Sequence, residues 1–306
     1  MLGAIVPTGH GQWRHITQMA EVIEDAGWDY LFCNEVPGSD SISAAFLATS
    51  VTKRLYVGTS IANIYLRHPF LMSNLASILQ ELSFRRFILG LGVSHPYFNE
   101  PVGVSTGHPV SEMLEYVSQI DKYTGGRENV PIWLAALRKP MSVLAGQIGD
   151  GALFNLVPLS YLPKAVANVR EGQSENIKTK DTMIATYIRI GVTKDEKRAR
   201  EAARKMLGFY CRLPAYQDLF TKAGYEDEME SFRLSVQSND HEAAKRALTD
   251  QLIADIAVFG TPLQCKEILS RYKQAGADAL LFAPLPIEGD ELPALFKPVL
   301  DVFRLT

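Results

Sequence analysis

Several side chains that could move a proton follow short apolar runs in this sequence. The run "DYLFC" (29–33) is followed by Asn34 and Glu35, and "FILGLG" (87–92) is followed closely by His95. A carboxylate or an imidazole acts as a general acid or base when its surroundings bring its pKa near the working pH. Each has a plainer alternative, because Glu35 could be a surface carboxylate and a loop histidine is often structural. His10 is a weaker candidate of the same kind.

Arg138 and Lys139 are candidates for binding an anion. Both stand directly before a predicted helix and after the apolar run "IWLAA" (132–136). Free N–H groups at a helix start and basic side chains together attract phosphate groups. Backbone of Ala136 and Leu137 would belong to the same turn. The alternative is that both basic side chains are simply solvated at the helix start.

The segment "RRFILGLGVSHPYF" (85–98) contains Gly90 and Gly92 but does not fit the dinucleotide-binding fingerprint. That fingerprint needs a third glycine where this chain has His95, and it needs a helix where Pro96 follows. Glycines at a strand end let a ligand approach the backbone closely. They can equally serve tight packing between a strand and its neighbours.

The composition is that of an ordinary globular chain. It has 306 residues, 47% of them hydrophobic, and a formal net charge of −3. This mild acidity gives no electrostatic reason to expect nucleic acid or a membrane surface as a partner. No apolar run approaches the roughly 20 residues that span a bilayer. The three cysteines are too few and too widely spaced for a metal site or a disulfide framework, so we expect a cytoplasmic protein.

Short apolar runs alternate with amphipathic helical segments along the chain, which indicates repeated β–α units. The eight predicted strands cover 2–6, 29–33, 55–61, 87–92, 132–136, 152–157, 183–192 and 279–284. Eight such units predict an α/β fold, a (β/α)8 TIM barrel forming a single domain over 1–306. A charged segment, 194–258, is predicted to be a helical insertion between strands seven and eight. A doubly wound sheet is the alternative.

Three segments resemble the luciferase-like flavin and deazaflavin oxidoreductases. They are "NIYLRHPFLMSNLASILQELSFRRFILGLGVSH" (63–95), "VPIWLAALRKPMSVLAGQIGDGALFN" (130–155) and "HITQMAEVIEDAGWDYLFCNE" (15–35). Their order and spacing match that family, whose known fold is a (β/α)8 barrel. The resemblance also implies a homodimer and a small-molecule substrate.

The resemblance implies that the flat ring of coenzyme F420, or alternatively of FMN, lies across the barrel's C-terminal mouth. A cis peptide at the end of the third strand would fall at Ser60–Ile61. The arginine–lysine pair would bind the cofactor's phosphate. The cofactor-binding residues implied in this way are Asn34, Ser60, Ile61, Asn63, Gly92, Val93, Ser94, Ala136, Leu137, Arg138 and Lys139.

The family commonly has an acidic residue and then a histidine where this chain has Asn34 and Glu35. Glu35 and His95 are therefore the catalytic candidates. The predicted function is hydride transfer between F420 and a small organic substrate, with one of these side chains managing the proton. An FMN-dependent monooxygenase that uses reduced flavin and O2 is the alternative. A catalytically silent flavin-binding homologue is a third possibility, kept open by the unusual Asn34–Glu35 pair.

Overall fold

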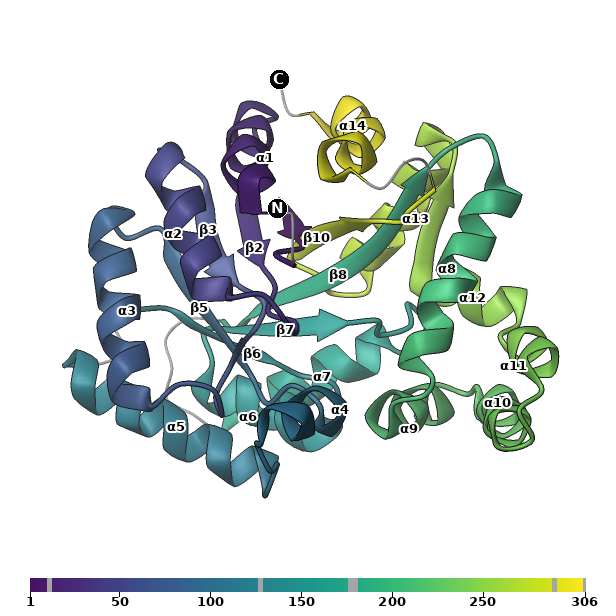
Figure 1. Ribbon diagram of the computed structural model, residues 1–306, viewed down its shortest axis with the longest axis horizontal. Coiled ribbons are helices and arrows are strands. Elements are labelled where there is room, and N and C mark those ends of the chain that lie inside the picture. The colour runs from purple at the N-terminus through teal and green to yellow at the C-terminus, as the bar shows by residue number, and fades with distance from the viewer. Residues whose placement is uncertain (10–12, 126–128, 176–180, 288–290, 305–306) are drawn as a thin grey trace.

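A closed barrel of parallel strands forms the centre of the molecule (Figure 1). The computed structural model describes residues 1–9, 13–125, 129–175, 181–287 and 291–304. The barrel strands are β1 (Leu2–Val6), β2 (Tyr30–Cys33), β3 (Tyr56–Thr59), β5 (Phe87–Gly92), β6 (Ile132–Ala135), β7 (Gly151–Asn155), β8 (Met183–Val192) and β10 (Ala279–Pro284). The barrel closes because β10 pairs in parallel with both β8 and β1. The predicted (β/α)8 barrel is confirmed, and the doubly wound alternative was wrong, since an open sheet has two unpaired edges.

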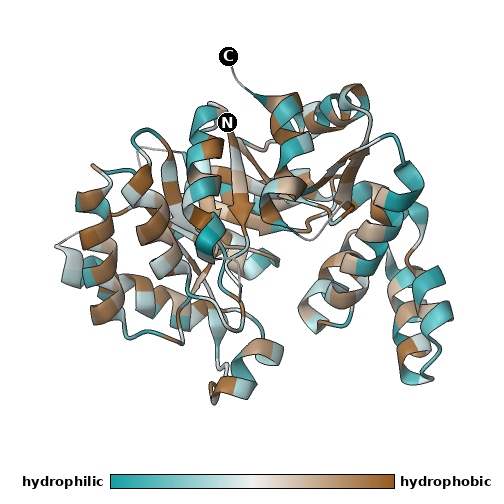
Figure 2. Ribbon diagram, turned by 45° about the horizontal axis from the view of Figure 1, so that its top comes forward, coloured by the Kyte–Doolittle hydropathy of each residue, from teal (hydrophilic) through white to brown (hydrophobic). Residues whose placement is uncertain are grey.

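Helices, most of them amphipathic, surround the barrel. They are α1 (Trp13–Asp25), α2 (Ser41–Val51), α3 (Pro69–Leu82), α4 (Pro96–Asn99), α5 (Pro109–Thr124), α6 (Lys139–Ile148), α7 (Leu162–Ser174), α13 (Pro262–Gln274) and α14 (Leu292–Phe303). In Figure 2, brown apolar positions on these helices alternate with teal hydrophilic ones. Helix α1 buries Ile16, Met19, Ala20 and Ile23, the face that the i, i+3, i+4, i+7 spacing predicts. None of the helices within the described ranges has the length and apolar character needed to span a bilayer.

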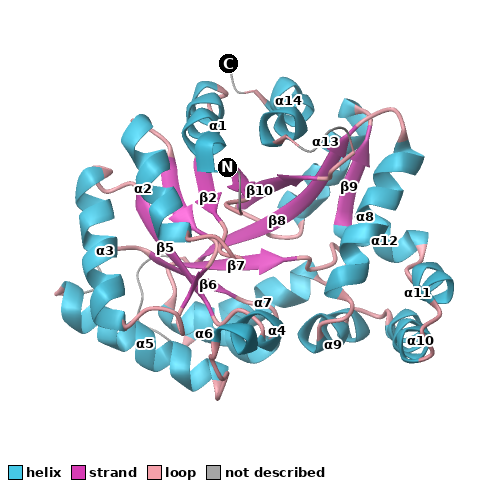
Figure 3. Cartoon of the chain, viewed as in Figure 1, coloured by secondary structure: helices cyan, strands magenta, loops and turns pink. Residues whose placement is uncertain are grey.

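The long excursion between β8 and β10 is built mainly of helices. These are α8 (Glu196–Tyr210), α9 (Pro214–Lys222), α10 (Glu226–Gln237), α11 (His241–Ala247) and α12 (Asp250–Ile256). They gather on the side of the barrel away from α2 and α3 (Figure 3). A short strand, β9 (Ala257–Gly260), follows them and pairs in parallel with β8. Strand β9 was not predicted from the sequence, because its few apolar residues continue directly from the apolar end of α12.

The third predicted strand, 55–61, is interrupted in the structure. Strand β3 ends at Thr59, and the peptide bond between Ser60 and Ile61 is cis, at the position that the sequence analysis named. A short strand, β4 (Ala62–Asn63), then pairs with the end of β5. The chain therefore leaves the barrel wall at Ser60 and rejoins it at the C-terminal mouth.

Alternate strand positions fill the barrel interior, as strand geometry requires. The interior cluster consists of Ile5, Tyr30, Phe32, Ile88, Trp133, Leu153, Ala185, Tyr187, Ala279, Leu281 and Ala283. Residues at the intervening positions of β8, such as Ile188, belong instead to the core beneath the surrounding helices. The interior is thus a packed apolar plug, and any ligand site must lie above it at an end of the strands.

Candidate functional site

A polar layer lies above the apolar plug at the C-terminal mouth. Asn34, Asn155 and Arg189 each stand two positions beyond a side chain of the interior cluster on the same strand. Because side chains two apart on a strand share a face, all three point inward at the mouth. Thr186 has the opposite parity and faces the outer core. The packing of the interior cluster thus identifies which of these residues point inward.

The segment around the cis peptide forms one side of this mouth. The hydroxyl group of Tyr187 donates a hydrogen bond to the carbonyl oxygen of Ser60 at 3.0 Å. The side chain of Ile61 packs on the interior cluster. A Cβ atom on Gly92 would lie 2.5 Å from Cγ1 of Ile61, so only glycine leaves room for that side chain. Gly92 therefore shapes the mouth by accommodating Ile61.

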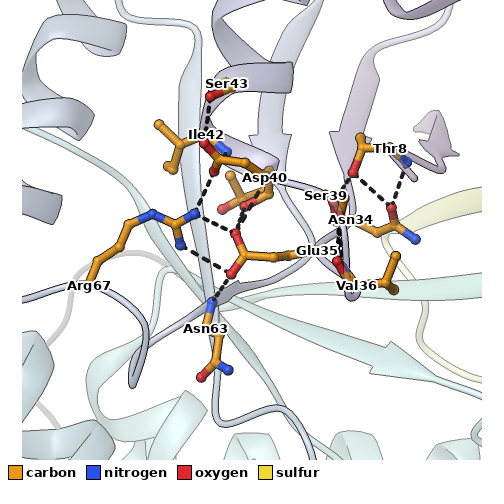
Figure 4. Close-up of polar contacts among 12 residues, drawn as sticks. Thr8, Asn34, Glu35, Val36, Ser39, Asp40, Ile42, Ser43, Asn63 and Arg67 are labelled. Atoms are coloured by element: carbon orange, nitrogen blue, oxygen red, sulfur yellow. Dashed lines mark hydrogen bonds and ion pairs between the residues drawn. The ribbon is translucent and has the colours of Figure 1, made fainter. Parts of the chain in front are cut away.

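Asn34 ties the ends of β1 and β2 together (Figure 4). The backbone N–H of Thr8 donates to Oδ1 of Asn34 at 3.0 Å. The hydroxyl group of Thr8 donates to the carbonyl oxygen of Asn34 at 2.6 Å. These bonds fix the Asn34 side chain at the rim of the barrel.

The Glu35 side chain is buried and bonded on several sides. Its side chain is 4% exposed, and both carboxylate oxygens accept from the guanidinium group of Arg67, at 3.1 and 2.8 Å. The Ser41 hydroxyl donates to the same carboxylate at 2.9 Å, and the backbone N–H of Asn63 donates at 3.1 Å. Figure 4 shows these groups converging on one carboxylate. This differs from the environment expected of a general acid or base, because both carboxylate oxygens are already bonded to groups of the protein.

Two asparagines connect the segments that follow β4 and β5. The side-chain amide of Asn63 donates to Oδ1 of Asn99 at 2.8 Å. The Asn99 amide donates in turn to the carbonyl oxygen of Val93 at 3.0 Å. Ser94 follows with a φ of 55°, in the left-handed region, so the chain turns sharply away from β5. Asn63 is buried and acts in this network, while Ser94 is exposed.

His95 caps the short helix α4. Its Nδ1 accepts a hydrogen bond from the backbone N–H of Tyr97 at 3.1 Å. Burial lowers the pKa of His95 below its ordinary value, and the nearby carboxylate of Glu100 opposes that shift. Both the cap and the burial favour a neutral imidazole. His10, the weaker candidate, lies outside the described residues.

The neutral state of His95 predicts a loss of stability in mild acid. The unfolded chain binds a proton at this residue below about pH 6.5, whereas the folded chain resists it. The contribution of neutral His95 to folding stability is therefore fully present above about pH 6.5. It is lost as the pH falls from there through the lower pKa of the folded state. We expect the melting temperature to fall less between about pH 7.5 and about pH 5.5 in His95→Asn, which keeps a cap acceptor. An equal fall in both proteins, measured by circular dichroism, would contradict this.

The two basic residues before α6 differ in their surroundings. Lys139 forms an ion pair with Glu171 of α7, with Nζ 2.8 Å from the carboxylate. Arg138 is exposed, and its side chain has no hydrogen bond or ion pair within the part of the chain that the structure describes. The backbone N–H of Ala136 is already bonded to the carbonyl oxygen of Leu153, so it is not available to an anion. Leu137 is half-buried between them.

Two tyrosines of the insertion reach the mouth, and the sequence analysis did not foresee them. The amide of Asn155 donates to the hydroxyl oxygen of Tyr216 at 2.7 Å. Nη2 of Arg189 donates to the hydroxyl oxygen of Tyr210 at 3.3 Å. The only signal in the sequence is the aromatic cluster "FYCRLPAY" (209–216) between charged helices. That pattern does not say where α8 and α9 dock.

In the described part of the chain, two buried polar atoms on residues of the mouth lack a partner. Ser60 Oγ and Arg189 Nε are both buried and have no hydrogen-bond partner within the described residues. Buried polar groups are normally paired, so orphaned ones next to a binding surface are suited to a ligand's own donors and acceptors. Arg138, at the start of α6, offers a cation for a phosphate. These residues therefore suit a phosphorylated flavin or deazaflavin.

Comparison with known proteins identifies relatives that cover nearly the whole chain. A family model described as luciferase-like monooxygenase matches residues 2–279. The 5,10-methylenetetrahydromethanopterin reductase of Archaeoglobus fulgidus is 24% identical over a 306-residue alignment that covers 92% of each chain. The coenzyme F420 dependent tetrahydromethanopterin reductase of Methanopyrus kandleri superposes with a TM-score of 0.81 at 20% identity, covering 99% of this chain and 97% of that one.

A flavin-bound neighbour has the same fold. The oxygenating constituent of 3,6-diketocamphane monooxygenase from Pseudomonas putida, solved with FMN, gives a TM-score of 0.71 at 14% identity, covering 99% of this chain and 96% of that one. At such identities the solved structures show the fold alone. The family model, in contrast, spans nearly the whole chain, including every barrel strand through the start of β10. The chain belongs to the luciferase-like monooxygenase family.

Proposed function

We propose that this protein is an oxidoreductase that uses coenzyme F420 to transfer hydride to or from a small organic substrate. The observation that carries the proposal is the pair of unpartnered buried atoms, Ser60 Oγ and Arg189 Nε, in the polar mouth of a luciferase-like barrel. The F420-dependent reductase with a TM-score of 0.81 supports the choice of cofactor. When bound, the deazaflavin supplies the hydride chemistry, and the protein supplies orientation and polarity.

The chain's own residues would hold this cofactor in three groups. Ser60, Ile61 and Gly92 form the surface for the ring, and Asn34 borders it. Val93 and Ser94, where the chain turns away from β5, would lie along the sugar-like side chain. Arg138 would bind the phosphate, with Leu137 beside it. Lys139 would contribute less, because Glu171 already neutralises it.

We propose different roles for the two catalytic candidates. Glu35 is a positioning residue, because its carboxylate holds the start of α2, the segment before α3 and β4 together through Ser41, Arg67 and Asn63. His95 remains the candidate that handles the proton. Its lowered pKa keeps it neutral near pH 7, and a neutral imidazole can accept a proton.

The alternative is an FMN-dependent monooxygenase that uses reduced flavin and O2. The superposition on an FMN-bound monooxygenase favours it, though less closely than the F420-dependent reductase does. The ion pair between Glu35 and Arg67 favours a third candidate, a homologue that binds flavin without turnover, because this carboxylate is not free to act in catalysis.

Titration with each cofactor separates these candidates. The purified protein is titrated with F420 and with FMN, oxidised and reduced, and ligand fluorescence is followed. Binding of F420 in the micromolar range with no binding of FMN supports the proposal. Preference for reduced FMN favours the monooxygenase. If neither F420 nor FMN binds, both the F420-dependent function and the monooxygenase are contradicted. Tight binding without turnover on any hydride donor or acceptor supports the silent homologue.

Replacing Arg138 with glutamine is expected to weaken F420 binding about tenfold, because a charge-assisted hydrogen bond to phosphate is lost. Lys139→Gln is the matched control, since it removes the same charge one residue away from a side chain that is already paired with Glu171. We expect that control to change the dissociation constant by less than about twofold. Equal losses in both variants would show that general charge, and not Arg138 itself, determines binding.

We also propose that two copies of the chain pair through the outer face of α2 and α3. Leu71, Ile78 and Leu82 repeat along α3 and are about half exposed, and Phe84 is 88% exposed. A hollow of about 900 Å³ on this face is lined by Phe84, by the apolar side chains of Phe46, Leu47 and Leu82, and by polar residues that include Lys53 and Arg86. A projecting ring that lines a partly apolar hollow on one face can be matched by a second copy about a two-fold axis.

Replacing Phe84 with glutamate is expected to convert the dimer to a monomer, because the charge would be buried without a partner at the interface. Leu263→Glu is the control, since Leu263 is 68% exposed but lies on α13. Sedimentation velocity should show a 33.9 kDa species for the Phe84 variant alone. A wild-type protein that is already monomeric at micromolar concentration would rule out this pairing.

A further inference from the structure

Arg189 is a cation at the barrel mouth with neutral partners only. Its Nη2 donates to Oδ1 of Asn155 at 3.0 Å and to the Tyr210 hydroxyl at 3.3 Å. The guanidinium carbon lies 5.9 Å from the centre of the Tyr210 ring. Nε is buried without a partner, and no carboxylate in the described ranges forms an ion pair with this side chain. Arg67, at the opposite rim, differs because it pairs with two carboxylates.

Five aromatic side chains form a wall beside Arg189, and we call them the aromatic wall. They are Tyr97 and Phe98 of α4, Phe209 and Tyr210 of α8, and Tyr216 of α9. The Tyr97 and Phe209 ring centres are 5.7 Å apart, and those of Tyr210 and Tyr216 are 4.9 Å apart. Tyr97 is 59% exposed and Phe209 is 37% exposed. The wall therefore joins the segment after β5 to the insertion and keeps apolar surface open to a ligand.

We infer that Arg189 binds a carboxylate of the substrate while the aromatic wall packs against the substrate's apolar, planar body. The inference rests on the proposed function, because it names a substrate class for that site. A partly buried guanidinium without a counter-ion is unfavourable, and an anionic ligand that accepts from its free N–H groups relieves this. Flat apolar groups stack well on exposed aromatic rings.

The charge balance favours a carboxylate over a phosphate. Of the three described residues that form the polar layer at the mouth, Arg189 is the cation, bonded to Asn155, while Asn34 is an amide bonded to Thr8. A singly charged carboxylate is matched by one guanidinium, whereas a doubly charged phosphate would leave negative charge uncompensated. Tyr210 and Asn155 already hold Nη2, so the guanidinium is oriented before the ligand arrives.

Benzoate and benzamide are a matched pair of probes, equal in shape and different in charge. Their dissociation constants are measured by ligand-observed NMR titration, with cofactor-free protein and again with F420 present. We expect benzoate to bind more tightly than benzamide. Arg189→Met should weaken benzoate binding about tenfold or more and leave benzamide binding nearly unchanged, since only the charge-assisted bonds are lost.

Three further variants separate the contributions. Arg198→Met removes an exposed positive charge on α8 and should leave both probes unchanged. Phe209→Ala should weaken both probes alike, because it removes part of the wall. Arg189→Lys keeps a cation if the methionine variant does not fold, and its benzoate affinity should lie between those of wild type and a charge-free site.

The inference is overturned if benzoate binds no better than benzamide, or if Arg189→Met or Arg189→Lys leaves benzoate affinity unchanged. It is also overturned if F420 displaces benzoate and the Arg189 variants lose F420 affinity, because Arg189 would then serve the cofactor. Failure of the proposed function looks different. In that case F420 does not bind in the cofactor titration, or reduced FMN is preferred to it, whatever benzoate does.

Discussion

Replacing Arg67 with methionine is expected to lower the free energy of unfolding by about 3–5 kcal/mol, the range for a buried ion pair that loses one partner. The Glu35 carboxylate, 4% exposed, would then be left buried without the guanidinium group that pairs with it. The Arg67 side chain is itself only 14% exposed, so solvent screens the pair weakly. Two hydrogen bonds from its guanidinium to Glu35 would be lost together.

Urea unfolding at neutral pH measures this loss. Arg233→Met is the control, because Arg233 also forms an ion pair, with Glu230, but on an exposed surface. We expect that variant to unfold close to wild type. A loss for Arg67→Met as small as for the control would mean that water or a neighbouring group compensates Glu35.

A double-mutant cycle tests the role assigned to Glu35. Glu35→Gln combined with Arg67→Met removes both charges, so the double variant should be more stable than Arg67→Met alone. A positioning role predicts that turnover and stability recover together. If stability recovers while turnover stays lost, Glu35 has a chemical function that its buried position conceals.

The barrel could be predicted from the sequence because each of its strands is a continuous apolar run followed by an amphipathic helix. The break at Ser60–Ile61 was placed by resemblance alone, since nothing in local periodicity marks it. Strand β9 was missed because its four residues continue an apolar helix end without a turn signal. The local sequence pattern thus predicts the buried parallel strands of the barrel well, and it predicts short additional strands such as β9 poorly.

The candidate site could be predicted only in part. The rule that ligands bind at the C-terminal ends of barrel strands identified Gly92 as a position to examine. Arg138 was identified by its place at a predicted helix start, and Asn34 by the family resemblance. The partner of Glu35 could not be foreseen, because Arg67 lies 32 residues away in the segment before a helix. The two tyrosines beside Arg189 depend on how the insertion docks. Contacts between distant segments leave no periodic signature in a single sequence.

Replacing Gly90 with alanine is expected to lower the free energy of unfolding by about 3 kcal/mol or more, at the upper end of the cost of overpacking a core. A Cβ atom there would lie 1.8 Å from the carbonyl oxygen of Thr59, and backbone of a neighbouring strand cannot turn aside as a side chain can. The Thr59 hydroxyl also donates to the carbonyl oxygen of Gly90 at 2.7 Å and accepts from its N–H at 3.0 Å. Separating β3 from β5 would break both bonds.

Gly92→Ala is the matched control, because the same methyl group there meets the side chain of Ile61 and not backbone. Ile61 can move to another rotamer, so we expect a smaller loss, about 1 kcal/mol. The displaced Ile61 would instead occupy the mouth, and F420 affinity should fall while the fold persists. The two substitutions, two residues apart on one strand, should therefore separate stability from binding. Equal stability losses in urea unfolding, or F420 affinity unchanged in Gly92→Ala, would show that Gly92 serves packing alone, as Gly90 does.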